Sequence, residues 1–392
     1  MSAAADKPGV VMFGSAAPVT CAVLDYARRL ADAVNARRPG FVKIETIEPA
    51  RPAAFVGAIV GALRSGATAH FQLPIEGWGN SVIPGSALLA ARALTRKGRI
   101  AVTMHEWTSL NRLRYLSMIP DLLATDGFVF VSPRQRDAFL STPWVGAKKK
   151  TAAPVIAIGP NIMPARMDPV LVAAETAKLR GEGSSRADLI VGFFGVLYAS
   201  KRPDLLLRTT QALHRQGVKA RLLICGDFLW DKPNDRAAFL ALAQELGVSE
   251  WLDFRGRIDD EAELMAALSA SDVFLLPYSD GVSLRRGSFQ AVSQLAIPLV
   301  TTKPERTDEF DAMPELKAKI ESAATALCPV DATPEQFAAA LVAVAKRRDA
   351  ALGVELGSLW RDAAERHLAF YDRLAGVPAP SEHAAHFLDA AE

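Results

Sequence analysis

Residues 189–204 read LIVGFFGVLYASKRPD, an apolar run that a short polar loop and a proline follow. The apolar run, which ends at Gly195, is typical of a buried strand. Pro203 suits the first turn of a helix, and the apolar spacing after it predicts a helix from Leu205 to His214. Strand, loop and helix in this order form a βα unit, which indicates a parallel sheet.

Units of this kind recur along the chain in two series of six. In the first half, apolar runs predict strands at Val10–Gly14, Val42–Ile47, Ala69–Leu73, Ile100–His105, Phe128–Ser132 and Val155–Gly159. In the second half they predict strands at Leu189–Gly195, Arg221–Gly226, Leu252–Gly256, Val273–Pro277, Pro298–Thr302 and Ala326–Pro329. Two prolines in the stretch 159–164 indicate a linker, so we place a domain boundary near residue 165. We therefore expect an α/β protein with two Rossmann-like, doubly wound domains and a ligand site between the carboxyl ends of their strands.

The composition narrows the class of protein further. Half of the 392 residues are apolar, which excludes a disordered or fibrous chain. The 45 basic and 43 acidic side chains give a net charge of +2, so nothing in the overall charge indicates a nucleic-acid partner. The charge is nevertheless uneven, because residues 1–165 hold 19 basic but only 10 acidic side chains.

Cysteine usage and targeting signals predict a cytoplasmic protein. The three cysteines are widely separated and fit neither a disulfide framework nor a zinc site, and no other cluster has metal-ligand spacing. We therefore expect buried thiols in a reducing compartment and no bound metal. The first residues lack the regions of a signal peptide, and no apolar stretch is long enough to span a bilayer.

Two loops of the second half each place adjacent cations just before a predicted helix. Lys201 and Arg202 close the first loop, and Arg285 and Arg286 lie in the second, PYSDGVSLRRGSFQAV. Free N–H groups at a helix start and guanidinium groups both bind phosphate oxygens, so the pattern predicts a diphosphate site. The alternatives are solvated surface charges, or a pairing of Arg285 with an acid such as Asp280.

The order of motifs in the second half carries a family resemblance. After the strand that ends at Gly195 come LLICGD at 222–227, LDFRGR at 252–257, SDVFLLP at 271–277 and PLVTT at 298–302. This order resembles the C-terminal domain of GT-B glycosyltransferases of family four, and a weaker resemblance extends over nearly the whole chain. It implies two domains that face each other across a cleft. The implied parts are an acceptor-binding domain at 1–165, a nucleotide-sugar-binding domain at 166–358, and a C-terminal helix and tail at 359–392 that packs back toward the N-terminal domain.

The resemblance also implies roles for residues at the family's motif positions. Lys201 matches the lysine that holds the donor diphosphate, the loop Phe254–Arg257 matches the segment around the nucleotide base, and His105 resembles the histidine that reaches the transferred sugar. With the cations included, the candidate catalytic residues are His105, Lys201, Asp280 and Arg286. The candidate donor-binding residues are Gly14, Gly195, Lys201, Arg202, Gly226, Arg255, Gly256, Ser283, Leu284, Arg285, Arg286 and Gln290.

Some positions depart from the family pattern. The family has two glutamates eight residues apart, whereas Gln290 stands at the second, which grips the ribose, and Asp280 lies ten residues before it, near the first. The arginine that usually follows the first strand of this domain is missing, since Val196 and Leu197 stand there. We expect the two adjacent arginines of the second loop to supply that charge.

The first half offers candidates for the acceptor side. His105 and His70 end or line predicted strands, and both could instead be hydrogen-bonded packing residues. Trp78 lies in a loop with glycines and either stacks on a sugar or a lipid-linked acceptor or closes the core. Glu76 or Glu106 could serve as the base for the acceptor hydroxyl.

Clusters of cations in the first half predict peripheral contact with an anionic membrane, unless folding scatters them as solvated charges. The clusters are Arg96 to Arg99, Arg112 with Arg114, Arg134 with Arg136, and Lys148 to Lys150.

We therefore expect a retaining, metal-independent transferase that moves a hexosyl group from a nucleotide-sugar to a glycan or lipid-linked acceptor, in polysaccharide or glycoconjugate synthesis. The nucleotide-sugar is a substrate, and we expect no cofactor and no nucleic acid. The cytoplasm, at the inner face of the membrane, is the expected location. Two alternatives stay open, namely a non-catalytic relative that binds nucleotide-sugar or polysaccharide and a sugar-nucleotide epimerase of the same fold.

Overall fold

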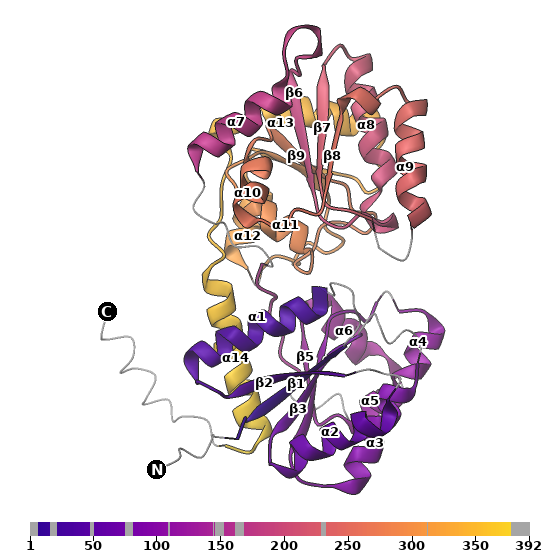
Figure 1. The fold of residues 1–392 in the computed structure, drawn as a ribbon, viewed down its shortest axis with the longest axis vertical. Coiled ribbons are helices and arrows are strands. Elements are labelled where there is room, and N and C mark those ends of the chain that lie inside the picture. The colour runs from indigo at the N-terminus through magenta and orange to yellow at the C-terminus, as the bar shows by residue number, and fades with distance from the viewer. Residues whose placement is uncertain are drawn as a thin grey trace, which may run out of the picture. The chain divides into compact units, whose positions relative to one another are not determined.

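The chain folds into two compact units in a computed structural model (Figure 1). Unit 1 holds the chain up to Gly159 and again from Gly357 onward, and unit 2 runs from Pro160 to Leu356. The structure describes residues 7–15, 22–47, 51–74, 81–108, 110–143, 145, 153–160, 168–228, 233–311 and 313–377.

Unit 1 is built on a parallel sheet with the strand order β2-β1-β3-β4-β5. The strands are β1 (Val10–Ser15), β2 (Val42–Ile47), β3 (Thr68–Leu73), β4 (Arg99–Met104) and β5 (Gly127–Phe130). The helices between them are α1 (Ala22–Arg37), α2 (Pro52–Arg64), α3 (Ile83–Leu94), α4 (Arg112–Ser117), α5 (Ile119–Ala124) and α6 (Pro133–Ser141).

The centre of this sheet is buried on both faces. Every residue of β3 is buried, which is the pattern of a parallel strand covered by helices on each side. Phe13 of β1 stacks on Phe71 of β3 with ring centroids 4.8 Å apart, and Phe55 of α2 packs beside both rings.

The predicted sixth strand of unit 1, Val155–Gly159, is wrong. Val155 forms only an isolated bridge with Phe130, which Ile156 supports by donating its N–H to the Phe130 carbonyl at 2.8 Å. Pro154 and Pro160 flank the segment, and a proline has no N–H to continue a ladder. The other eleven predicted strands are confirmed, with ends that differ by at most two residues.

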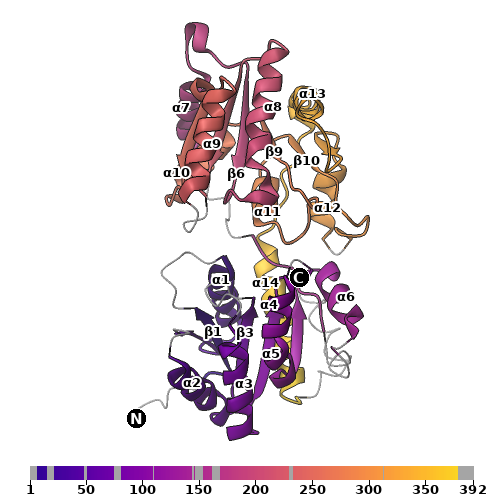
Figure 2. The same cartoon turned by 90° about the vertical axis from the view of Figure 1, so that its right-hand side faces the viewer.

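The C-terminal helix α14 (Ser358–Leu374) packs against unit 1 (Figures 1 and 2). The hydroxyl of Tyr371 lies 2.6 Å from Nδ1 of His70 in β3. Arg38 at the end of α1 donates two hydrogen bonds of 3.1 Å to Asp372. Trp360 lies so close to Gly159 that a Cβ at that glycine would clash with its ring. The polypeptide therefore leaves unit 1 after Gly159 and returns to it with its last helix.

Unit 2 is built on a parallel sheet with the strand order β11-β10-β9-β6-β7-β8. The strands are β6 (Leu189–Phe194), β7 (Ala220–Cys225), β8 (Leu252–Gly256), β9 (Val273–Leu276), β10 (Leu299–Thr302) and β11 (Thr325–Cys328). The helices are α7 (Pro169–Arg180), α8 (Pro203–Arg215), α9 (Pro233–Glu245), α10 (Glu261–Ser269), α11 (Gly287–Ser293), α12 (Pro314–Glu321) and α13 (Pro334–Ala345).

The strand order of unit 2 fixes where a ligand site is expected. The chain builds outward from β6 through β7 and β8, then returns to the other side of β6 with β9, β10 and β11. The order reverses between β6 and β9, and open α/β sheets bind ligands beyond the carboxyl ends of the strands at such a switch point. The two cation-bearing loops follow these two strands. The prediction of two Rossmann-like, doubly wound domains is thus confirmed. Among the described residues, none of the helices is long and apolar enough to cross a membrane.

Candidate functional site

Three glycines line the carboxyl ends of the neighbouring strands β6, β7 and β8. Gly195, Gly226 and Gly256 have φ angles of 119°, 145° and 65°, in the region that favours glycine. The Gly226 N–H donates to the Gly256 carbonyl at 2.7 Å, and a Cβ at Gly226 would lie only 2.1 Å from the Gly195 carbonyl oxygen. These loops therefore approach one another backbone to backbone, and the close approach at Gly226 leaves no room for a side chain.

Lys201 is the central cation of the site. It follows β6 in a short 3₁₀ turn (Ala199–Lys201), is only 6% exposed, and donates from Nζ to Oγ of Ser288 at 2.8 Å. The Ser288 hydroxyl in turn lies 2.7 Å from the hydroxyl of Tyr278, directly after β9. A Cβ at Gly195 would come within 2.6 Å of the lysine Nζ, so this glycine is what admits the ammonium group.

The environment of Lys201 favours the neutral form of its side chain. Burial lowers the pKa of its ammonium group from 10.5 to about 7, and the nearby Arg286 guanidinium acts in the same direction. An anion bound beside Lys201 and Arg286 would raise the pKa of the lysine again, since an opposite charge favours the charged form. It would thus oppose the effects of both burial and the neighbouring guanidinium. An anion bound beside Lys201 would therefore restore the charge of its ammonium group.

Arg286 stands at the start of α11 and is 5% exposed. Its Nη1 donates to the hydroxyls of Tyr198 at 3.2 Å and Ser200 at 3.4 Å, and its guanidinium lies 4.6 Å from the centre of the Tyr278 ring. The backbone of Ser279 also donates to the Ser200 carbonyl at 2.9 Å. The loop after β9 is therefore fastened to the loop after β6, which fixes the guanidinium near the lysine.

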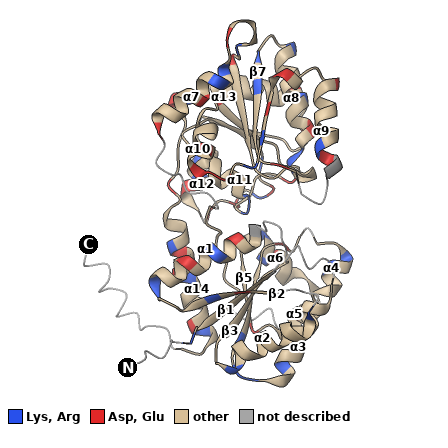
Figure 3. Cartoon of the chain, in the orientation of Figure 1, with Lys and Arg blue, Asp and Glu red and all other residues tan. Residues whose placement is uncertain are grey.

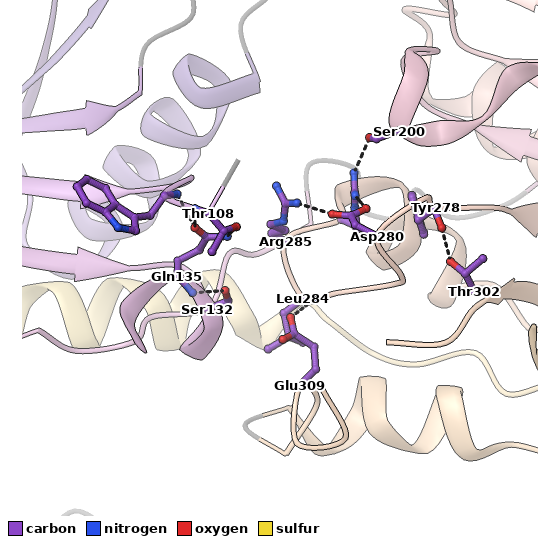
Figure 4. Close-up of polar contacts among 12 residues, drawn as sticks. Thr108, Ser132, Gln135, Ser200, Tyr278, Asp280, Leu284, Arg285, Thr302 and Glu309 are labelled. Atoms are coloured by element: carbon purple, nitrogen blue, oxygen red, sulfur yellow. Dashed lines mark hydrogen bonds and ion pairs between the residues drawn. The ribbon is translucent and has the colours of Figure 1, made fainter. Parts of the chain in front are cut away.

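Asp280 lies between the two arginines of the second loop. Its Oδ2 accepts a hydrogen bond of 2.8 Å from Arg285, and its Oδ1 accepts one from Arg286 (Figure 4). The pairing of Arg285 with Asp280 considered from the sequence is thus confirmed. One carboxylate cannot neutralise two guanidinium groups, so the three side chains together keep a net positive charge.

Arg202 does not join this cluster. It takes a left-handed conformation with φ of 48°, and its Nη1 donates to the Val330 carbonyl at 2.6 Å. The guanidinium is thereby held at the loop after β11, while Lys201 beside it in the sequence turns inward. Sequence reasoning treated the two cations alike, because a pair of adjacent residues does not reveal that the backbone reverses between them.

Arg255 is also engaged elsewhere. It forms ion pairs with Asp253 at 2.5 Å and with Glu175 of α7 at 3.0 Å. Its hydrogen bonds with Asp253 raise the pKa of the guanidinium, which therefore stays charged and bound to these carboxylates. Gly256, the next residue, is buried, and its carbonyl already accepts the Gly226 N–H.

Gln290 shapes the second loop from within. Its side chain is buried, and its Nε2 donates to the Leu284 carbonyl at 2.7 Å. The Leu284 N–H donates to Oε1 of Glu309 at 3.0 Å, and Glu309 is only 3% exposed (Figure 4). Ser283 is buried next to them. Sequence reasoning missed Glu309, since a carboxylate in a charged stretch gives no sign of its burial.

His105 follows β4 in unit 1 and is packed. Its Nε2 lies 3.0 Å from Oε1 of Gln72, and its ring meets the ring of Tyr26 edge-on at 4.8 Å. Burial, together with the nearby His367, lowers the pKa of His105 to about 3, so the imidazole is neutral at ordinary pH. His70 is fully buried, and its Nε2 lies 2.9 Å from Oγ1 of Thr103.

The loop after β4 is held by one glutamine of α6. Gln135 accepts from the N–H of Trp107 and from that of Thr108, and its own amide donates back to Thr108 at 3.2 Å (Figure 4). Gly14 in β1 admits Leu24 of α1, since a Cβ there would lie 2.6 Å from the leucine Cδ1. Other candidates of this unit, Glu76, Trp78 and Lys148 to Lys150, lie outside the described residues.

The sequence of unit 2 matches a known family. Residues 188–347 match the family Glycosyl transferases group 1. The match lies within unit 2. No curated protein sequence matches the chain. The described residues of this domain and of unit 1 contain no cluster of three or more potential metal ligands.

Solved structures share the fold of the whole chain. Anabaena Alr3699/HepE, in a complex with UDP and glucose, is 14% identical, with 93% of this chain and 100% of that chain covered and a TM-score of 0.64. The catalytic domain of starch synthase IV from Arabidopsis thaliana is 13% identical, with 94% and 100% covered and a TM-score of 0.61. Sucrose-phosphate synthase from Thermosynechococcus elongatus is 16% identical, with 98% and 100% covered and a TM-score of 0.59. These similarities establish that the chain has the GT-B fold.

Proposed function

We propose that the protein transfers a sugar from a nucleotide-sugar to a glycan or lipid-linked acceptor, as in the synthesis of polysaccharides or glycoconjugates. The observation that carries this proposal is the buried pair of Lys201 and Arg286 at the switch point between β6 and β9. Asp280 offsets only part of the positive charge of Lys201, Arg285 and Arg286, so this buried site favours an anion, which the diphosphate of a nucleotide-sugar supplies. The GT-B fold and the domain family agree with this choice.

In this proposal each group of the site has a separate task. Lys201 and Arg286 bind the diphosphate and stabilise the charge that develops on it as the glycosidic bond breaks, so the step needs no metal. The loop after β8 receives the nucleotide base along its backbone. Asp280 faces the sugar hydroxyls, and the reaction retains the anomeric configuration, as in the family that the sequence resembles.

The experiment compares nucleotide binding with turnover. UDP and ADP are the first probes, because the HepE and starch synthase IV structures contain them. A nucleotide that binds the folded protein alone raises the melting temperature. Arg286→Ala should weaken this binding by roughly tenfold to a hundredfold, the value of a lost charge-assisted hydrogen-bonding group. Arg306→Ala is the matched control, since that arginine is paired with Asp308 on the surface.

One observation favours a second candidate, a non-catalytic relative that binds nucleotide-sugar. The Asp280 carboxylate accepts hydrogen bonds from two arginines, and the Gln290 amide donates to the Leu284 carbonyl. Neither side chain therefore faces a donor sugar in the way that the glutamates of the family would. Binding of a nucleotide-sugar without release of nucleoside diphosphate, over a panel of acceptors, would support this candidate. Unchanged binding in Arg286→Ala would refute both.

A further inference from the structure

One side of unit 1 exposes large apolar side chains on three successive helices. Leu94 at the end of α3, Leu113 and Leu116 in α4, and Leu123 in α5 are 60%, 66%, 61% and 60% exposed. The helices α3 and α5 pack on each other, and α4 runs directly into α5 (Figure 2). Leu113 and Leu116 are three residues apart and so share one side of α4. Single exposed leucines are ordinary, but a group of this size on adjoining helices marks an interaction surface.

The same surface contains an apolar cavity. It has a volume of about 460 Å³ and is lined by Arg112, Tyr115, Leu116, Ile119 and Thr142. Tyr115 and Ile119 are only partly covered, although both belong to the helices that carry the exposed leucines. The cavity thus extends the apolar surface inward, and a cation lies at its wall.

The exposed charges in the stretch of chain that carries these leucines are of one sign. Among the described residues from 82 to 125, the exposed charged side chains are Arg96, Lys97, Arg99 and Arg112. Figure 3 colours the basic and acidic positions along the ribbon. The two acidic residues of this stretch do not offset them at the surface. Asp121 is buried, and Glu106 is half-buried. The surface therefore combines exposed leucines with uncompensated positive charge.

We propose that this surface, the α3–α5 face, docks onto an anionic lipid bilayer. The leucines enter the boundary between headgroups and acyl chains, Arg112 and the cations after Leu94 contact the lipid phosphates, and the cavity takes part of an acyl chain. Exposed apolar anchors on a stretch of chain whose exposed charges are all positive fit an anionic lipid surface better than a protein partner, whose interface core excludes charge. The inference does not depend on the proposed transfer reaction.

Vesicle binding by the full chain tests this inference. The purified protein is sedimented with vesicles of phosphatidylcholine alone and with vesicles that contain about one-third phosphatidylglycerol. We expect binding to the anionic vesicles that weakens as salt rises. The triple variant Leu113→Gln, Leu116→Gln, Leu123→Gln should lower the partition coefficient at least about tenfold, since each leucine loses apolar burial in the bilayer.

Two further variants make the outcome decisive. Neutralising Arg96, Lys97 and Arg112 to glutamine should remove most of the salt dependence and leave a weak residual binding. The matched control replaces three exposed apolar residues of unit 2 by glutamine in the same way. These are Val170, Leu171 and Leu240, which are 73%, 45% and 40% exposed. This control should bind vesicles as the wild type does.

Three results would overturn the proposal. The first is a wild-type protein that fails to bind anionic vesicles at low salt. The second is a leucine variant that binds as well as the wild type. The third is a wild-type dimer that the leucine variant converts to a monomer without any vesicle binding, which would make the α3–α5 face a self-association surface. None of these measurements uses sugar transfer, so failure here is distinguishable from failure of the proposed function.

Discussion

Replacement of Asp280 by asparagine is the sharpest test of the anion site. The carboxylate accepts hydrogen bonds from both Arg285 and Arg286, and it is 30% exposed. If it serves as an internal counter-ion that a diphosphate meets on arrival, its removal takes one negative charge away from both guanidinium groups. Asp280→Asn should then bind UDP more tightly than the wild type.

The size of the gain follows from the geometry. A carboxylate about 4 Å from a phosphate repels it by ~4 kcal/mol at an effective dielectric constant of about 20. The partial exposure of Asp280 reduces this by screening, and the asparagine amide gives weaker partners to the arginines than the carboxylate did. A net gain of about 1.4 kcal/mol, or roughly tenfold in Kd, is therefore expected.

Isothermal titration with UDP, alongside sugar transfer under saturating donor, separates the roles of this residue. Tighter UDP binding together with lost transfer would show that Asp280 both balances the arginines and acts on the sugar. Weaker UDP binding in a variant with an unchanged melting temperature would refute the counter-ion argument, because the carboxylate would then be needed to orient the arginines. Glu309→Gln is a useful comparison, since it alters a carboxylate that holds the same loop from the side of Leu284.

Three further predictions concern the lysine, its glycine and the last helix. Because the pKa of Lys201 is lowered in the folded protein, the unfolded chain binds one more proton between about pH 7 and pH 10. The free energy of unfolding should therefore rise with pH across that window. Urea unfolding of Lys201→Met should lack this rise. Gly195→Ala should abolish nucleotide binding in a thermal-shift assay, because its Cβ meets the lysine Nζ at 2.6 Å, whereas Gly217→Ala, with open space around it, should bind normally. Tyr371→Phe should lower the free energy of unfolding by about 1–2 kcal/mol, since it leaves His70 without its hydroxyl partner, and an unchanged urea midpoint would contradict this.

The positions of most strands were predictable because parallel strands covered by helices are largely apolar. Apolar runs such as residues 189–194 carry their own signal, and glycine or proline marks their ends. The exception, Val155–Gly159, is as apolar as the true strands. Its failure follows from the prolines on either side, which stop a ladder that the side chains alone would allow.

The candidate site was predictable as a set of loops but not as a set of contacts. The positions of Lys201 and Arg286 after β6 and β9 follow from the order of the elements. Their chemistry depends on partners far away in the sequence. Lys201, for example, donates a hydrogen bond to Ser288, which lies 87 residues further along the chain. No local pattern could show that the Arg202 side chain binds the Val330 carbonyl, because its direction depends on the left-handed backbone conformation of Arg202 itself.

The protonation of Lys201 links these observations into one consequence for ligand binding. An ammonium group with a pKa of about 7 is only partly charged in the free protein at neutral pH, whereas a bound diphosphate favours the charged form. Binding must therefore take up a proton, and affinity for UDP must fall as the pH rises above 7. In Lys201→Met the same titration should be flat over this range. A wild-type affinity that does not change between pH 7 and pH 9 would mean that the anion does not reach the lysine.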